Sequence, residues 1–185
     1  MEEEYYHLQP IGLTQGVSLS NIYLIMLREE KSLRIAPILI SKEECGIIDN
    51  AMHKQDFSTI TLMLRLAHSY DIFLERVQIK FSNKGIASTV LYFKSGKEEK
   101  HLTSNIANGV VAALNQQVPL VITAQDFSQH ILKHQTEGKV AVPLSMMTED
   151  LLNEALKSAV KEENYELASV IRDEIKLRNK ELGLS

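Results

Sequence analysis

Residues 77–102, VQIKFSNKGIASTVLYFKSGKEEKHL, contain three runs of strand-forming residues separated by two turn signals. The first turn signal is the triplet Asn83-Lys84-Gly85, and the second is the pair Ser95-Gly96. Asparagine, serine and glycine tolerate the backbone conformations that tight reversals need. The stretch therefore predicts a β-meander.

Helical patterns lie on both sides of this meander. Ser41 is a good N-cap, and Glu43 and Glu44 follow it in the first turn, where the helix dipole favours acidic side chains. This helix is expected to end near residue 54. The other segments expected around the meander are helices at 58–70, 104–115 and 124–133, and a short buried strand at 119–123.

The first third of the chain is extended. Apolar residues alternate around His7, and the run from 22 to 27 is apolar throughout. A polar turn at 28–32 separates this run from a second β-rich segment at 33–40. These patterns predict strands that precede the first helix.

Composition and charge limit the classes of protein to which this chain can belong. The 185 residues carry a net charge of −4, with 44% hydrophobic and 24% charged residues, which is typical of a soluble globular chain. Domains that depend on phosphate contacts are usually basic, so the charge weighs against a dedicated nucleic-acid binder, although a local basic groove stays open. The single cysteine, Cys45, fits a reducing compartment, the acidic start lacks the apolar centre of a signal peptide, and no apolar run approaches membrane-spanning length. We expect a cytoplasmic protein without membrane contact.

Two groups of polar residues could form other sites. Lysines and aromatic residues share the meander and could form a DNA or RNA surface, but Glu98 and Glu99 interrupt them, so an exposed hairpin is the simpler interpretation. Asp126, His130 and His134 share one predicted helix face, yet their spacing matches no zinc motif, so we predict a solvated face and no metal site. The lysines and aromatic residues of the meander are Lys80, Lys84, Lys94, Lys97, Lys100, Phe81, Tyr92 and Phe93.

The chain changes character after a non-periodic linker at 136–147. Residues 148–185 are rich in Leu, Ala, Glu, Lys and Arg at helical spacing, and Asn164 is a plausible N-cap between two apolar stripes. Small residues such as Ala155 and Ala168 allow two backbones to approach closely, so an antiparallel αα-hairpin follows. A hairpin of this size has too little core to be stable alone, so its apolar face should dock on its own body or on another chain.

The block from Ala159 to Ile175, with Glu163-Asn164-Tyr165-Glu166-Leu167-Ala168 at its centre, resembles the UVR motif, the helical hairpin of bacterial excision-repair subunits. The resemblance covers about residues 150–182 and implies a role in protein–protein contact. The alternative is a helix pair that only packs on its own body. The resemblance assigns partner contact to Leu152, Leu156, Tyr165, Ala168, Ile171, Arg172 and Ile175.

Residues 33–127 resemble the bifunctional nuclease domain, whose members are described as cleaving DNA and RNA. The blocks that carry the resemblance are Arg34–Ser41 followed by Glu44, Phe73–Ile79, Ala107–Leu114 and Val118–Ile122. It implies an α+β fold over residues 1–135, with a mixed twisted sheet and packed helices, and a tendency to form homo-oligomers.

The polar residues depart from the pattern of that family. Glu44 keeps its charge, but the positions where the family carries most of its Arg, His and Asp residues are occupied by other side chains. Phosphodiester hydrolysis needs an activated water and positive charge, supplied by Mg²⁺ or Mn²⁺ held by carboxylates, or by arginine. Two hypotheses follow: a weak or inactive nuclease, and a non-catalytic oligomeric adaptor on the same fold. The substituted positions are Asp56, Ile60, Thr61, Thr103, Asn105 and Asn108.

Overall fold

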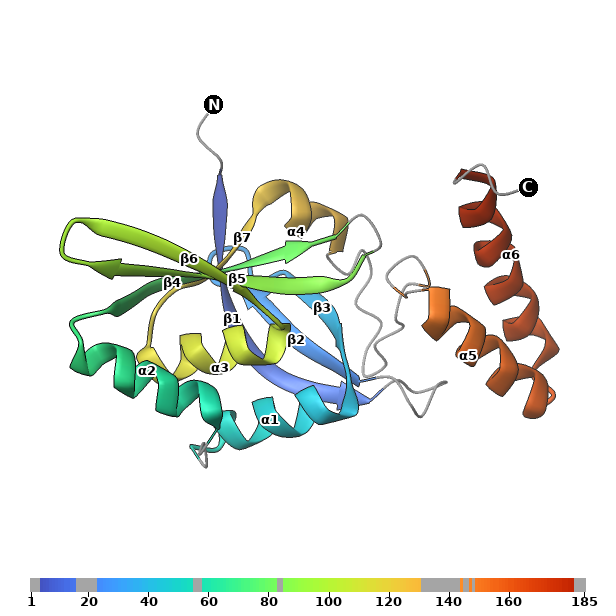
Figure 1. Cartoon of the computed structure of the whole chain (residues 1–185). Helices are drawn as coiled ribbons and strands as arrows, with labels where there is room; N and C mark the ends of the chain where they lie inside the picture. The colour runs from blue at the N-terminus through green and yellow to red at the C-terminus, as the bar shows by residue number, and fades with distance from the viewer. Residues whose placement is uncertain are drawn as a thin grey trace.

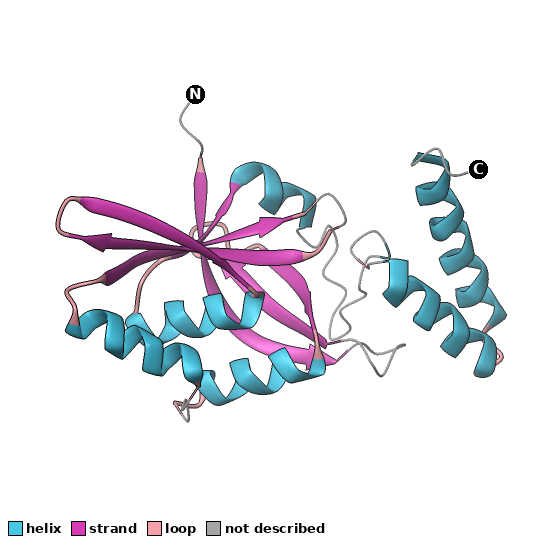
Figure 2. Cartoon of the chain, in the orientation of Figure 1, coloured by secondary structure: helices cyan, strands magenta, loops and turns pink. Residues whose placement is uncertain are grey.

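A computed structural model describes residues 4–15, 23–54, 58–82, 85–130, 144, 147 and 149–181. Figure 1 shows a sheet with helices packed on it and a pair of helices beside β2 and β3; Figure 2 separates helices from strands by colour. The α+β class, the mixed sheet and the C-terminal helix pair predicted from the sequence are confirmed. The strands are β1 (Tyr5–Gln15), β2 (Tyr23–Glu29), β3 (Ile35–Ile40), β4 (Phe73–Phe81), β5 (Ala87–Ser95), β6 (Glu98–Ser104) and β7 (Leu120–Thr123). The helices are α1 (Lys42–Met52), α2 (Thr59–Ser69), α3 (Ile106–Gln116), α4 (Ala124–His130), α5 (Glu149–Lys161) and α6 (Tyr165–Glu181).

The seven strands form one sheet in the order β3-β2-β1-β7-β4-β5-β6. The N-terminal meander (β1, β2 and β3) and the meander predicted at 77–102 (β4, β5 and β6) form its two halves, and β7 lies between them. β7 pairs antiparallel with β1 and parallel with β4. The late strand β7 therefore joins the two halves and makes the sheet mixed.

One face of the sheet carries the main core beneath α1, α2 and α3 (Figure 1). Ile25, Ile79 and Ile122 are fully buried there, together with Ile48 of α1 and Val110 of α3. Helix α4 also contributes, because the ring of Phe127 is fully buried and meets Tyr6 edge-on at 5.3 Å. Burial of such side chains stabilises the fold by about 1.5–3 kcal/mol each.

Helix α3 lies unusually close to strand β5. A Cβ atom added to Gly109 would be 2.3 Å from Oγ1 of Thr89, a distance that real Cβ atoms do not reach. Thr89 is itself fully buried, and its hydroxyl donates a hydrogen bond of 2.8 Å to the carbonyl oxygen of Asn105. Only glycine allows this approach.

Strand β2 is apolar on both faces, and both faces are covered. Ile25 and Leu27 point into the main core. Leu24 and Met26 point the other way, because successive side chains of a strand alternate. There they form a second buried cluster with the helix pair, which we call the docking cluster. Its buried members are Leu24, Met26, Met147, Leu152, Ala155, Ala159, Ala168 and Ile171.

Parts of the predicted organisation fall outside the described residues. The predicted linker at 136–147 is described only at Leu144 and Met147, and Met147 is 1% exposed within the docking cluster. The end of that segment therefore belongs to packed structure. The domain boundaries themselves stay predictions. Among the described residues, no helix is long and apolar enough to cross a membrane.

Candidate functional site

The C-terminal hairpin contains a tight turn between α5 and α6, which local hydrogen bonds define. Glu163 adopts a left-handed conformation with φ of 56°, and the backbone N–H of Asn164 donates to the carbonyl oxygen of Ala159 at 2.8 Å, which ends α5. The side-chain oxygen of Asn164 then accepts a hydrogen bond from the N–H of Leu167 at 3.2 Å. Asn164 is the predicted N-cap of α6, and this prediction is confirmed.

The inner face of the hairpin packs on the body of the same chain. Leu152 and Ile171 are fully buried, and Ala168 is 8% exposed. All three belong to the docking cluster with Leu24 and Met26 of β2. Of the residues predicted to contact a partner, these three are therefore already buried in the cluster that the hairpin shares with the sheet.

The remaining predicted contact residues are more accessible. Leu156 and Ile175 are half-buried at the edge of the docking cluster. Tyr165 is 68% exposed, and Arg172 is exposed on the same helix. The guanidinium of Arg172 lies 3.8 Å from the carboxylate of the neighbouring Asp173. The hairpin thus divides into an inner face that docks and an outer face that meets solvent.

Apolar side chains also remain on the outer face of the hairpin. Val160 is 51% exposed next to the turn, close in sequence to Tyr165. Val170 and Leu177 are each 54% exposed, and their spacing of seven residues places them on one side of α6. We refer to Val160, Tyr165, Val170 and Leu177 as the outer hairpin surface.

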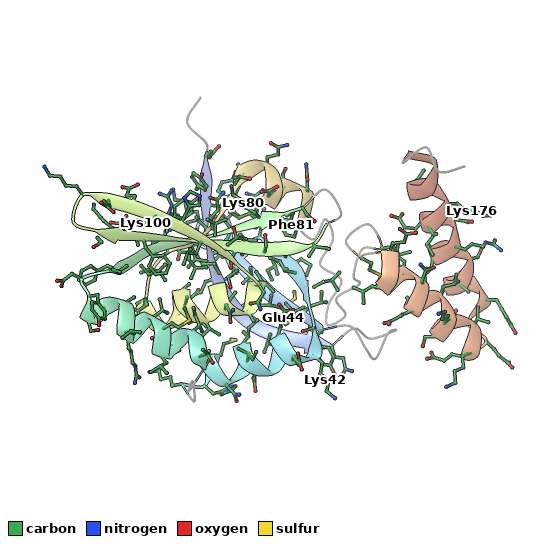
Figure 3. All side chains as sticks on the ribbon, viewed as in Figure 1. Lys42, Glu44, Lys80, Phe81, Lys100 and Lys176 are labelled. Carbon is green, nitrogen blue, oxygen red and sulfur yellow. The ribbon has the colours of Figure 1, made fainter. Side chains whose placement is uncertain are left out.

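In the body, Glu44 holds the start of α1 (Figure 3). Its carboxylate accepts a hydrogen bond of 2.9 Å from the N–H of Ser41, and the Ser41 hydroxyl accepts one of 3.1 Å from the N–H of Glu44. This reciprocal pair is a capping box. Glu44, the side chain predicted to be catalytic, therefore has a structural role as part of the helix cap.

Three of the substituted positions lie at the start of α3. Asn105 is the N-cap and accepts a hydrogen bond of 2.8 Å from the N–H of Asn108. The Asn108 side chain donates to the Ser104 hydroxyl at 3.0 Å. Thr103 is exposed on β6. These side chains are neutral, so they offer no charge to a phosphate.

The substituted positions on α2 are also structural. Ile60 packs against the main core. Thr61 is 3% exposed, and its hydroxyl lies 3.1 Å from that of Ser58 and accepts a hydrogen bond of 3.4 Å from Asn115 of α3. Asp56 lies outside the described residues. Within the described part of the chain, no three histidine, cysteine or acidic side chains come together as metal ligands.

The structure describes only some members of the two other candidate groups, the predicted helix face with Asp126 and the basic residues of the meander. The predicted face of Asp126, His130 and His134 cannot be followed as a whole, since His134 and the His130 side chain lie outside the described positions. Asp126 accepts a hydrogen bond of 3.0 Å from the Thr123 hydroxyl at the start of α4. This contact accounts for the one member of the group that the structure describes.

The lysines and aromatic residues of the meander lie in different environments, and the sequence did not predict which of them are exposed. Figure 3 labels Lys80 and Phe81 at the end of β4 and Lys100 on β6. Phe81 packs against the main core, whereas Lys80 is exposed. The ammonium group of Lys100 lies 3.3 Å from the Glu98 carboxylate. Lys84 lies outside the described residues.

Lys94 of the same meander is likewise neutralised, because its ammonium group lies 3.4 Å from the carboxylate of Glu75. Tyr92 lies beneath the guanidinium of Arg76, at 4.1 Å from the ring centre, and donates a hydrogen bond of 2.7 Å to Gln78. The aromatic ring is therefore occupied by contacts within the chain. These pairings reduce the positive charge that the meander could present to DNA or RNA.

Comparison with known proteins adds one match. Residues 150–179 match the UvrB/uvrC motif, which coincides with α5, the turn and most of α6. No curated protein matches the chain. The resemblance to the UVR motif is confirmed over these residues, and this match does not extend to residues 33–127.

The sequence interpretation missed the surface on which the hairpin docks. The signal was present in the run from Tyr23 to Leu27, which is apolar at every position. An unbroken apolar strand is typical of one that is buried on both faces. Such a strand needs a second covering layer, and the hairpin is the amphipathic element that supplies it.

Proposed function

We propose that this protein works by association, and that the UVR-type hairpin binds a partner protein through its outer surface. The match of residues 150–179 to a motif of protein-interaction type carries the proposal. The geometry supports it, because the inner face is used by the docking cluster while Tyr165 and Val170 stay more than half exposed. A cytoplasmic location and the domain boundaries at 135 and 148 go with this proposal.

Tyr165 is the expected centre of the contact. Exposed tyrosine and arginine side chains carry a large share of the binding energy in protein interfaces, and Arg172 lies nearly two turns further along the same helix. Helices that present apolar anchors of this kind bind grooves or other helices. The partner is therefore expected to offer an apolar helical surface with acidic groups near Arg172.

Substitution tests this proposal better than removal of the hairpin, because removal would expose Leu24 and Met26. The full-length chain with Tyr165→Ser and Val170→Ser is compared with the intact chain as bait in extracts of the source cells, with quantitative mass spectrometry. Leu102→Ser is the control, since Leu102 is 58% exposed on β6. We expect recovery of the specific partner to fall on the order of tenfold for the hairpin variant only. Equal recovery with all three proteins would contradict the proposal.

The relation of residues 33–127 to bifunctional nucleases is a second proposal, supported by the sequence blocks and by the α+β body with its mixed sheet. Its test is cleavage of single-stranded DNA and RNA with Mg²⁺ or Mn²⁺. Glu44→Gln removes the charge but keeps an oxygen for the capping box, and Glu43→Gln is the matched control. Cleavage lost only in Glu44→Gln would support a nuclease. No cleavage by any of these proteins would leave the non-catalytic adaptor.

A further inference from the structure

The turn between β2 and β3 contains a residue in an unfavourable backbone conformation. Leu33 has a φ of 59°, in the left-handed region that glycine or asparagine normally occupies in such a turn. The other non-glycine residues with a positive φ in the described part of the chain are polar and follow helices: Lys54, Asp71, Gln117 and Glu163. Leu33 is instead an apolar residue between two strands. Backbone strain of this kind is concentrated at functional sites.

Packing within the chain does not explain this choice of residue. The side chain of Leu33 is 60% exposed, and its neighbours Lys31, Ser32 and Arg34 are exposed as well. Glycine would adopt the same backbone conformation without strain. The leucine therefore contributes little to the stability of this turn, and its apolar surface is available to another molecule.

Hydrogen bonds nevertheless hold the turn in one conformation. The buried carboxylate of Glu29 accepts hydrogen bonds from the N–H groups of Lys31 and Ser32. The N–H of Leu33 donates to the carbonyl oxygen of Glu29 at 3.0 Å, and the N–H of Glu29 donates to that of Arg34 at 2.8 Å. A side chain on a fixed backbone loses less conformational entropy on binding than one on a mobile loop.

Arg34 is also held in position. Its guanidinium lies over the ring of Phe127, at 5.0 Å from the ring centre, and over that of Tyr6 at 5.4 Å. Its Nε donates a hydrogen bond of 2.8 Å to the Ser32 hydroxyl. No described carboxylate forms an ion pair with Arg34, so its two Nη groups keep their donors for an outside acceptor. Two parallel N–H donors of arginine match the two oxygens of a carboxylate.

The charges around the turn indicate the kind of ligand. Lys31 is a second exposed cation, but Glu30 is an exposed acid next to it, and the whole chain has a net charge of −4. A DNA or RNA strand carries a charge on every phosphate, so Glu30 and the net charge repel it, and its backbone offers no apolar group to Leu33. A carboxylate beside an apolar side chain fits both Arg34 and Leu33.

We propose that the β2–β3 turn binds an acidic and apolar segment of a partner protein. A carboxylate of the segment pairs with Arg34, with Lys31 beside it, and an apolar side chain of the segment packs on Leu33. This surface shares no residue with the outer hairpin surface, and it lies at the other end of β2 from Leu24. The two proposals can therefore fail independently.

The experiment uses the isotope-labelled full-length chain and a capped peptide of the sequence Gly-Glu-Asp-Leu-Phe-Asp-Glu-Gly. We expect the peptide to shift the amide resonances of residues 29–34, Tyr6 and Phe127, and to saturate them with a Kd in the high micromolar range. The same peptide with lysine at each acidic position, and a single-stranded oligonucleotide, should leave these resonances unchanged. No shift with the acidic peptide, or an equal response to the oligonucleotide, would overturn the proposal.

Substitution of Arg34 tests the charge. Arg34→Gln should weaken binding of the acidic peptide by about tenfold. Arg65→Gln is the matched control, because it removes the same charge from an exposed arginine on α2 and should leave the affinity unchanged. Equal losses in both variants would mean that only the net charge of the chain attracts the peptide.

Substitution of Leu33 separates binding from folding. Leu33→Gly should weaken binding by a similar factor, yet it should keep the midpoint of thermal unfolding or raise it by up to about 4 °C, because the strain is removed. A clearly lower midpoint would show that Leu33 serves the fold. An unchanged affinity would exclude Leu33 from the binding surface.

Discussion

Strand β2 and helix α2 are both apolar on two sides, but the chain covers them differently. On β2, Leu24 is fully buried in the docking cluster, whereas Leu66 of α2 is 59% exposed. Both side chains are leucines with comparable apolar area, so residue type does not distinguish them. What differs is whether another amphipathic element of the same chain covers the second apolar side. The outward face of β2 is covered within the described chain, and that of α2 stays exposed to solvent.

The largest expected effect tests the covered side of this comparison. Leu152→Ala removes a fully buried side chain from the docking cluster and should lower the free energy of unfolding by about 2–5 kcal/mol. Denaturant unfolding measures the loss, and hydrogen exchange should show faster exchange in α5, α6 and β2. Unchanged exchange in β2 would mean that the hairpin does not cover it.

A second prediction concerns the helix that supports α2 from the inner side. Gly109→Ala forces a methyl group against Thr89 and should cost about 1–3 kcal/mol of stability. Gly46→Ala on α1 is the matched control. Nothing lies within 4 Å of a Cβ atom there, so alanine should be neutral or stabilise the helix by up to about 1 kcal/mol. Equal effects of the two substitutions would argue against the close packing of α3 on β5.

A third prediction concerns the end of β2, where the covered strand turns toward β3. Glu29 is 2% exposed, and its pKa is lowered, chiefly by a hydrogen bond with the Ser32 side chain and also by the N–H groups of Lys31 and Ser32. Because the folded state prefers the ionised form, Glu29 stabilises the fold above the unfolded pKa of about 4.3, and this contribution is lost as pH falls through the lower folded value.

Glu29→Gln should therefore cost about 1–3 kcal/mol at pH 7, and the difference from the unchanged chain should shrink as the pH is lowered below about 4. Urea unfolding at a series of pH values measures this difference. A stability difference that stays constant down to pH 3 would show that ionisation of Glu29 is not its source.

The smallest expected effect on stability is that of a substitution on the exposed side of α2. Leu66→Ser should change the stability of the isolated chain by less than about 0.5 kcal/mol, because the side chain is already in water. Thermal unfolding of the variant and of the unchanged chain measures this difference. A large loss of stability would place Leu66 in the core.

The elements that depend on neighbouring residues followed from the sequence. Ser41 and Glu44 form the predicted helix start, and Asn164 caps α6 as expected. Caps, turns and apolar periodicity act over three to seven residues, so the local order of side chains is enough to predict them. The same locality made the UVR hairpin recognisable over residues 150–179. Family position assigned Glu44 to catalysis, and this assignment stays a prediction; the contacts that the structure shows for Glu44 are those of a helix cap.

The sequence by itself predicted most of the strands and helices, the caps at Ser41 and Asn164, and the presence of a C-terminal hairpin. Only the tertiary structure decided that β7 pairs between the two meanders, that Leu24 and Met26 lie under the hairpin, and that Leu62 and Leu66 stay in water. The physical reason is that burial depends on which distant segment covers a surface. Two leucines on equally amphipathic elements can therefore have opposite environments, and no local pattern distinguishes them.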